Sequence, residues 1–295
     1  MRWWIYQKER FPLLAHGPLI LVFSACAVSY SALLRGGEPH WPAYAVAFGV
    51  CLLFFLQLRI ADEFKDAGED ARWRPYRPVP RGLVKLRELG WVFVMAAVVQ
   101  LGLSLFYDFR LGWVLAIGWA YLALMSVEFF ARDWLKARPV VYLLTHMGIM
   151  PLVDFFATAC DWMPRGGPPA GLGPFLAASF FNGIVIEVGR KLRQPEDEEE
   201  GVETYSALWG RKRGLAVWIG CQGLTLVFAT VAAARIGFAL PVASTLAVLM
   251  VVSLAVGIRY VKGGLKGRVI EGLAGAWTLV LYAMLGVVPM GLKWF

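Results

Sequence analysis

Three aspartates follow one another at intervals of four residues between two apolar runs: Asp62, Asp66 and Asp70. On a continuous helix this spacing places all three carboxylates on one face. Such a row of like charges is unfavourable unless a cation lies against it. A divalent metal holding a diphosphate suits the row, because hard cations bind carboxylate and phosphate oxygens together. We therefore predict these aspartates as metal ligands. The alternative is a solvated helix face paired with Lys65 and Arg74.

Arginines follow the acids in a loop that is punctuated by proline, from Arg72 to Gly82. Guanidinium groups bind phosphate oxygens in pairs, so acids followed by arginines would suit a metal–diphosphate site. We expect Arg77 to contact the diphosphate and Arg81 to assist. The alternative is that both arginines fix the membrane topology or bind lipid head groups.

A second acidic cluster, Glu196 to Glu200, follows a later apolar run. Its members could join the first row in one site at the membrane surface; the choice of Asp197 as the metal ligand among them rests on the family resemblance described below. Acids directly after Pro195 are equally typical of the first turn of a helix. Among polar residues inside the apolar runs, Asn182 and Glu187 precede this cluster and are expected to line the site. His146 is expected to make only an interhelical hydrogen bond.

The composition predicts a polytopic membrane protein. The chain has 295 residues, of which 59% are hydrophobic and 17% are charged, and its mean hydropathy is +0.59. Soluble domains are about half apolar and about a quarter charged. The four cysteines are scattered without a CxxC pair, so neither a zinc site nor a disulfide framework is indicated. We predict a single polytopic membrane domain over residues 1–295, all-α, with nine transmembrane helices. They are placed near 13–34, 41–58, 89–107, 111–130, 140–160, 172–189, 214–234, 238–258 and 270–291.

The basic residues alternate between the two sides of these nine predicted helices. Of the 29 lysines and arginines, 24 fall on one side and 5 on the other. The positive-inside rule then places the N-terminus in the cytoplasm and the C-terminus outside. Both acidic clusters fall in long cytoplasmic loops, about 59–88 and 190–213. The net charge of +8 needs no nucleic acid as partner, because the basic residues concentrate beside the membrane.

The segment 62–82 resembles the first signature of the UbiA superfamily of intramembrane prenyltransferases, NDxxDxxxD followed by RPxxxG. Asp62 stands at the Asn position and Glu63 at the first Asp, while Asp66 and Asp70 match the remaining acids. The RP element corresponds to Arg77–Gly82. The resemblance covers nearly the whole chain and implies nine helices, with acidic loops after the second and the sixth.

The second signature of this family, DxxxD before a Gly, a Thr/Ser-rich turn and a closing Gly, is only partly matched. Aligned on Gly201–Gly210, it places its second acid, a metal ligand, at Asp197 and its first at Arg193, which cannot ligate a metal. Either a nearby acid replaces that ligand, namely Glu187, Glu196, Glu198 or Glu200, or the metal is held differently in this chain. The YxxxK element corresponds to Glu128–Arg132. The resemblance implies two Mg²⁺ ions that bridge acids and diphosphate, with arginines and Lys191 adding positive charge. Departure of the diphosphate then leaves an allylic cation for the acceptor to capture.

We therefore predict a Mg²⁺-dependent prenyltransferase of the cytoplasmic membrane, with Asp66, Asp70 and Arg77 as the catalytic residues. Its partners would be a polyprenyl diphosphate, an aromatic or other lipid-soluble acceptor, and membrane lipid. One rival is a transporter or metal-ion permease, which would carry acids near mid-bilayer on broken helices. Another is a protein that binds prenyl lipid without turnover, as Arg193 suggests.

Overall fold

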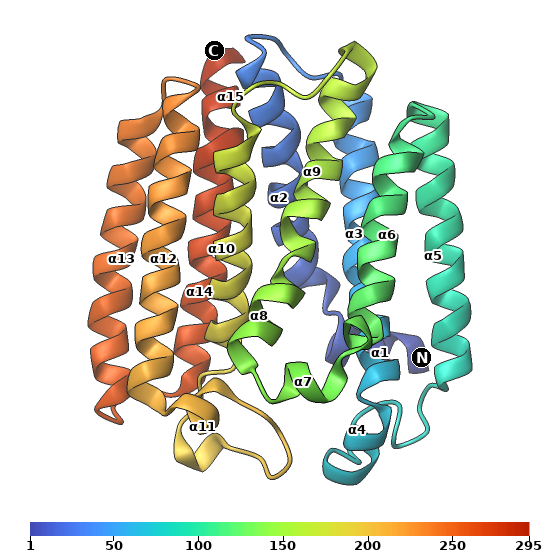
Figure 1. Cartoon of the computed structure of the whole chain (residues 1–295), viewed down its shortest axis with the longest axis vertical. Helices are drawn as coiled ribbons and strands as arrows, with labels where there is room; N and C mark the ends of the chain where they lie inside the picture. The colour runs from blue at the N-terminus through green and yellow to red at the C-terminus, as the bar shows by residue number, and fades with distance from the viewer. Residues whose placement is uncertain (295) are drawn as a thin grey trace.

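The long apolar runs of the sequence form long α-helices, as expected where lipid offers backbone groups no hydrogen-bond partner. The structure is a computed structural model that describes residues 1–294 (Figure 1), and it contains no β-strand within that range. Eight helical segments are long and apolar enough to cross a membrane. They are α2 (Leu13–Leu34), α3 (Trp41–Lys65), α5 (Leu86–Tyr107), α8 (Pro139–Met147) continued by α9 (Ile149–Trp162), α10 (Leu172–Arg190), α12 (Arg211–Ala234), α13 (Ala239–Val261), and α14 (Gly267–Tyr282) continued by α15 (Val288–Trp294).

A further apolar helix, α6 (Leu111–Ser126), has only 16 residues. The prediction placed its end at residue 130, but the chain leaves the helix after Ser126 because Glu128, Phe129 and Phe130 all adopt positive φ. The prediction of an all-α integral membrane protein is confirmed in this coarse form.

Four short helices gather at one end of the bundle. They are α1 (Arg2–Arg10), α4 (Ala67–Trp73), α7 (Arg132–Lys136) and α11 (Tyr205–Trp209), and Figure 1 shows them at the lower end of the molecule, with the C-terminus at the upper end. The single-turn helices η1 (Glu128–Phe130) and η3 (Pro195–Asp197) belong to the connections that carry α7 and α11. Both acidic clusters of the sequence therefore lie at the same end of the bundle.

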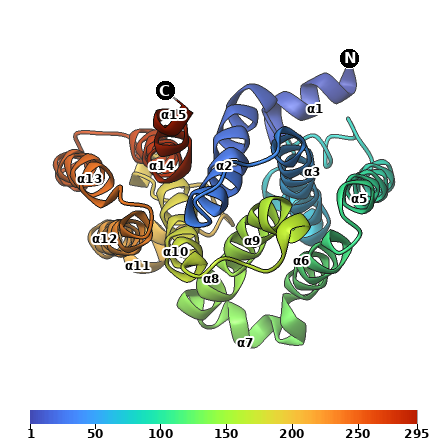
Figure 2. The same ribbon diagram turned by 90° about the horizontal axis from the view of Figure 1, so that it is seen from above.

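Seen from above, α2, α9 and α10 lie in the middle, while α5 and α13 form opposite edges (Figure 2). In the most apolar stretch of α2 or α10, 56% of the residues are buried, against 22% in α5 and 17% in α13. The edge helices therefore present apolar side chains to the surroundings, as lipid requires. The centre is packed closely: a Cβ on Gly286, in the π-helical turn η4 (Ala283–Val287), would come within 2.5 Å of the Cys26 carbonyl oxygen on α2.

A buried ion pair joins two helices near the upper end of the bundle. Asp161 near the end of α9 accepts hydrogen bonds from Arg35, at 2.6 and 3.0 Å, and from Ser31 at 2.7 Å. The single-turn helix η2 (Met163–Arg165) follows directly. Because the Asp161 carboxylate is saturated by these partners, it ties α2 to α9.

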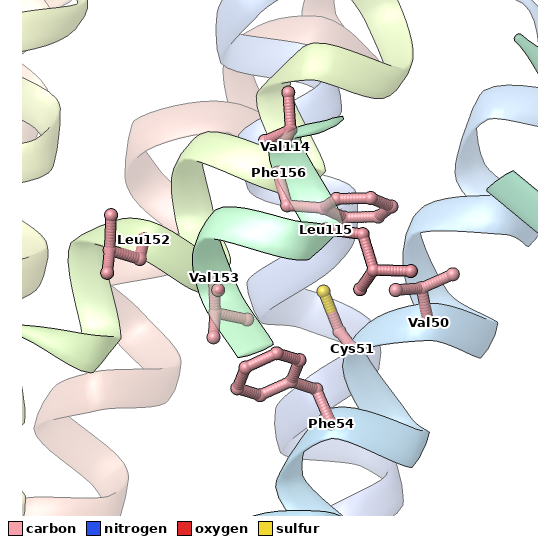
Figure 3. Close-up of a pocket in the computed structure, with 9 residues that line it drawn as sticks. Val50, Cys51, Phe54, Val114, Leu115, Leu152, Val153 and Phe156 are labelled. Carbon is pink, nitrogen blue, oxygen red and sulfur yellow. The ribbon is translucent and has the colours of Figure 1, made fainter. Parts of the chain in front are cut away.

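Between α3, α6 and α9 the packing leaves a void of only about 10 Å³ (Figure 3). Its walls are apolar: Val50, Cys51, Phe54, Val114, Leu115, Gly118, Leu152, Val153 and Phe156. A site of this size without polar partners holds no ordered water. This void is therefore too small and too apolar to be a ligand-binding site.

Candidate active site

A cavity of about 670 Å³ opens at the end of the bundle that carries the short helices. Its deeper wall is apolar and is formed by Leu19, Ile20, Phe23, Phe55, Leu58, Met125, Met147, Ile149, Met150 and Ile186. Its rim is densely charged. The charged lining comprises nine cations and eight acids: Arg10, Arg59, Lys65, Arg74, Arg77, Arg132, Lys136, Arg190 and Lys191, with Glu9, Asp62, Asp66, Glu69, Glu128, Glu187, Glu203 and Glu271. An apolar chamber beneath a charged rim suits a ligand with a lipid tail and an ionic head.

The first two predicted aspartates line this cavity. Helix α3 ends at Lys65 and the chain turns at Asp66, although backbone hydrogen bonds still join Asp66 to Asp62 and Asp70 to Asp66. Asp62 lies 3.6 Å from Arg59, and Asp66 has no ion pair within residues 1–294. Burial and the nearby Asp62 charge raise the pKa of the Asp66 carboxyl above its usual value. Both carboxylates therefore keep oxygens for a cation.

The third aspartate of the row is occupied. Asp70 is 2% exposed, its Oδ1 is 2.7 Å from Arg74 and its Oδ2 is 2.7 Å from Arg77. The turn at Asp66 carries Asp70 away from the cavity lining, while Arg74 and Arg77 do line it. In this structure Asp70 therefore orients two guanidinium groups, and its role as a metal ligand stays a prediction.

The remaining residues of the first loop lie beside the cavity. Glu63 is buried and forms an ion pair with Arg10 of α1. Arg81 contacts Glu9 at 2.9 Å and the Tyr76 carbonyl at 3.0 Å, and it is absent from the cavity lining. Of the predicted diphosphate contacts, Arg77 and Lys191 line the cavity.

In the second acidic cluster, two acids form hydrogen bonds with other side chains, and the predicted ligand lies off the cavity. Asp197, in η3, is absent from the cavity lining. Glu198 accepts hydrogen bonds from Thr204 at 2.7 Å and from Ser206 at 2.7 Å. Glu199 accepts one from Tyr76 at 2.6 Å, which links this loop to the first. These contacts engage Glu198 and Glu199 only, and the ligand role of Asp197 stays a prediction.

A close backbone contact reinforces that link. Gly201 has φ +72°, and a Cβ there would come within 2.3 Å of the Trp73 ring on α4. Only glycine allows this approach without displacing the ring. The two acidic loops thus meet at the mouth of the cavity.

On the α10 side, the acid that faces the cavity is Glu187, as expected. Asn182 was also expected to line the site, but it is buried against α14, where it accepts a hydrogen bond from Thr278 at 3.1 Å. Glu187 Oε2 is 2.7 Å from Arg190 and Glu187 Oε1 is 2.9 Å from Lys191. The spacing i, i+3 and i, i+4 is the one at which opposite charges meet on a helix. That spacing was visible in the sequence and could have predicted that Glu187 carries its own counter-charges.

A third wall of the cavity forms around Glu128, the first residue of the segment aligned with the YxxxK element, although that alignment did not predict the contacts of its carboxylate. Glu128 is 4% exposed, and its carboxylate lies 2.8 Å from Lys65, 3.2 Å from the Tyr142 hydroxyl and 3.2 Å from His146 Nε2. His146 was expected to make only a hydrogen bond between helices, but its Nδ1 lies 2.8 Å from the Tyr142 carbonyl of its own helix, and its side chain lines the cavity. Three consecutive positive φ angles at residues 128–130 hold Glu128 in place. Such backbone strain is typical of functional sites, and nothing in the letters Glu-Phe-Phe signals it.

The residues that line the cavity suit a divalent metal ion held by one or two carboxylates better than a metal site built from three or more protein ligands. No three His, Cys, Asp or Glu side chains within residues 1–294 come together as a metal site. Mg²⁺, however, is commonly held by one or two carboxylates together with substrate phosphates and water. Asp62 and Asp66 supply that minimum at the rim, with Arg74 and Arg77 beside them for phosphate oxygens.

The sequence of the chain over residues 21–269 matches the UbiA prenyltransferase family. The chain belongs to this family. The resemblance seen in the two acidic segments is thereby confirmed. A search of curated proteins returned no match.

Solved structures with the same architecture include other UbiA proteins. An apo UbiA homologue from Aeropyrum pernix K1 aligns with a TM-score of 0.71 at 14% identity, over 92% of this chain and 98% of that one. A structure of digeranylgeranylglyceryl phosphate synthase aligns at 0.63 and 15%, over 98% and 99%. A UbiA homologue from Archaeoglobus fulgidus bound to GPP and Mg²⁺ aligns at 0.57 and 11%, over 97% and 99%. At these identities the UbiA fold is what the likeness establishes.

Proposed function

We propose that the chain is a Mg²⁺-dependent intramembrane prenyltransferase. It transfers an isoprenyl group from a polyprenyl diphosphate to an aromatic or other lipid-soluble acceptor in the cytoplasmic membrane. The observation that carries the proposal is the single cavity in which Asp62, Asp66, Arg74 and Arg77 stand at the rim of an apolar chamber. Family membership and the GPP and Mg²⁺ in the Archaeoglobus fulgidus homologue support it.

The proposed roles follow from what each side chain is free to contact. Asp62 and Asp66 hold the metal, which supplies positive charge that offsets the charge developing on the departing diphosphate. Arg77, with Arg74 beside it, binds diphosphate oxygens, and Asp70 keeps both arginines aimed at the cavity. Lys191 faces the same space. The apolar wall holds the prenyl tail and keeps water from the allylic carbon.

The proposed topology keeps nine transmembrane helices, with α6 as the shortest. The N-terminus and the loops 59–88 and 190–213 lie in the cytoplasm, and the C-terminus lies outside. The whole chain then forms one membrane domain. The placement of α1 and the C-terminus at opposite ends of the bundle supports this topology (Figure 1).

The permease alternative has less support. It needs acids in mid-bilayer that are free to receive a cation. Asp154, a buried acid on α9, accepts a hydrogen bond from Tyr282 at 2.9 Å, and Asp161 is saturated by Arg35 and Ser31. The other Asp154 oxygen has no hydrogen-bond partner, but Asp154 is fully buried and does not line the cavity. The carboxylates with free oxygens that do line the cavity, Asp62 and Asp66, stand at its rim, which favours the enzyme.

The test is release of diphosphate by the purified protein in detergent. Geranyl, farnesyl and longer prenyl diphosphates are offered with a membrane lipid extract as acceptor, in Mg²⁺ or in EDTA. We expect release in Mg²⁺, with little in EDTA or in Asp66→Ala. Asp133→Ala is the matched control, because Asp133 is exposed on α7 and does not line the cavity. Equal release by Asp66→Ala and the wild type would refute the proposal.

A further inference from the structure

The two sides of the cavity differ in whether their acids are free. Asp66 lacks an ion pair within residues 1–294, whereas Glu187 is engaged by both Arg190 and Lys191. We propose that Glu187, Arg190 and Lys191 form a fixed cationic subsite that binds diphosphate oxygens directly. The cavity then takes one divalent cation, at Asp62 and Asp66. This inference rests on the proposed function, and it departs from the two-ion arrangement that the family resemblance implies.

The charges of the subsite favour an anion over a second metal ion. Each Glu187 oxygen has a cationic nitrogen within 2.9 Å, and the three side chains together carry a net charge of +1. A divalent ion brought to the same oxygens would meet two like charges at short range. A diphosphate would meet the same two cations as hydrogen-bond donors.

The last turn of α10 is held rigidly by its neighbours. A Cβ on Gly189 would lie 2.7 Å from the Ala274 Cβ and 3.0 Å from the Trp218 indole nitrogen. The same indole donates a hydrogen bond to the Val185 carbonyl at 3.0 Å. Because α10 packs this tightly against α12 and α14, the backbone that carries the cations is set before any ligand arrives. Charges fixed in advance stabilise a developing anion without reorganisation.

The acids at 196–200, which could have held a second metal beside α10, do not line the cavity. Arg193 stands at one ligand position, and its backbone is tied by Ser206 at 2.8 Å and by the Tyr260 hydroxyl at 2.8 Å. Asp197 does not line the cavity, and Glu198 is held by Thr204 and Ser206. No free carboxylate of this segment therefore faces the subsite.

Two further acids, Glu203 and Glu271, line the cavity on exposed stretches of chain. Within residues 1–294, they are the only remaining acids of the cavity lining that could hold a second metal ion. The experiment therefore includes Glu203→Gln/Glu271→Gln as a double variant.

The test uses geranyl thiolodiphosphate, in which a bridging sulfur slows ionisation, as an unreactive probe. Its binding to purified protein in detergent is measured by calorimetry in EDTA and in Mg²⁺. The metal is then replaced by Mn²⁺ on the probe complex, and electron paramagnetic resonance distinguishes one isolated ion from a coupled pair. We expect measurable binding in EDTA and a spectrum of one isolated Mn²⁺ ion, unchanged in the Glu203/Glu271 double variant.

Point variants test whether metal-free binding of the probe depends on the subsite itself or on positive charge in general. Lys191→Met should weaken metal-free binding by about tenfold or more, the usual value of a charged hydrogen bond. Glu187→Gln should tighten it, because the competing carboxylate is gone. Asp66→Asn should weaken binding in Mg²⁺ without weakening metal-free binding, because it removes a proposed metal ligand and no cation. Lys212→Met, an exposed lysine away from the cavity, is the matched control. Lys191→Arg should retain binding, and thermal unfolding confirms that each variant is folded.

The outcomes are distinct. A coupled Mn²⁺ pair, or binding that requires metal and ignores Lys191→Met, overturns the cationic subsite while the proposed prenyltransferase stands. Absence of probe binding with and without metal overturns both. Metal-free binding that depends on Lys191, with one isolated Mn²⁺ ion, supports the subsite.

Discussion

The two acidic segments of this chain have similar charge but different roles in the structure. In the first, Asp62 and Asp66 face the cavity with oxygens to spare. In the second, Glu198 and Glu199 are hydrogen-bonded within or between loops, and Asp197 lies off the cavity lining. The difference shows that the partners of each carboxylate, more than the density of acids, determine which oxygens remain available to a cation.

The same contrast exists inside the first segment. Asp66 and Asp70 are four residues apart, yet one lacks a counter-charge and the other carries two. The turn at Asp66 separates them. We therefore propose that Asp70 orients the two arginines and that Asp66 holds the metal.

Removing one acid from each segment is the most direct test of the difference between them. We expect Asp66→Ala to lower the rate of diphosphate release by at least about 100-fold, the scale typical of a lost transition-state charge partner. Asp197→Ala should change it by less than about threefold, because Asp197 does not line the cavity. Initial rates at saturating Mg²⁺ and prenyl diphosphate check both. Comparable losses would mean that both segments hold metal.

Asp70→Asn tests the orienting role. The variant leaves Arg74 and Arg77 partly buried without their carboxylate, so we expect a loss of about 3 kcal/mol in the free energy of unfolding. Thermal unfolding in detergent measures the loss. If Asp70 is instead a metal ligand, the unfolding midpoint should stay near that of the wild type while Mg²⁺ affinity falls.

Arg77 and Arg81 provide a matched pair on the same loop. Arg77→Ala should raise the KM for prenyl diphosphate by about tenfold or more, since a charged hydrogen bond is lost. Arg81→Ala should leave the KM nearly unchanged, because Arg81 contacts Glu9 and a backbone carbonyl at the surface. Equal effects would show that the exposed arginine also reaches the diphosphate.

The smallest effect concerns the link between the two loops. Tyr76→Phe removes the hydrogen bond to Glu199 and should lower stability by about 1 kcal/mol. Limited proteolysis of the loop 196–203 and the unfolding midpoint check this. The phenylalanine keeps the ring in place, so activity should change little. A large loss of diphosphate release would assign the second loop a direct part in the site.

The sequence by itself determined the membrane architecture and the general place of the site. Apolar runs long enough to cross lipid can form only helices there, so composition and length suffice. The family signature likewise pointed to Asp62, Asp66 and Arg77, because local spacing on one segment brings these residues to one rim. The i, i+3 and i, i+4 spacing of Glu187, Arg190 and Lys191 was also legible.

Only the tertiary structure decided which acids are free. Asp70 is occupied because the chain turns at Asp66 and folds Arg77 back onto it. Glu128 reaches the cavity because packing against Lys65, Tyr142 and His146 sustains a left-handed turn that its own residues disfavour. Hydropathy and spacing act along one segment, whereas the pairing of charges depends on segments far apart in the sequence.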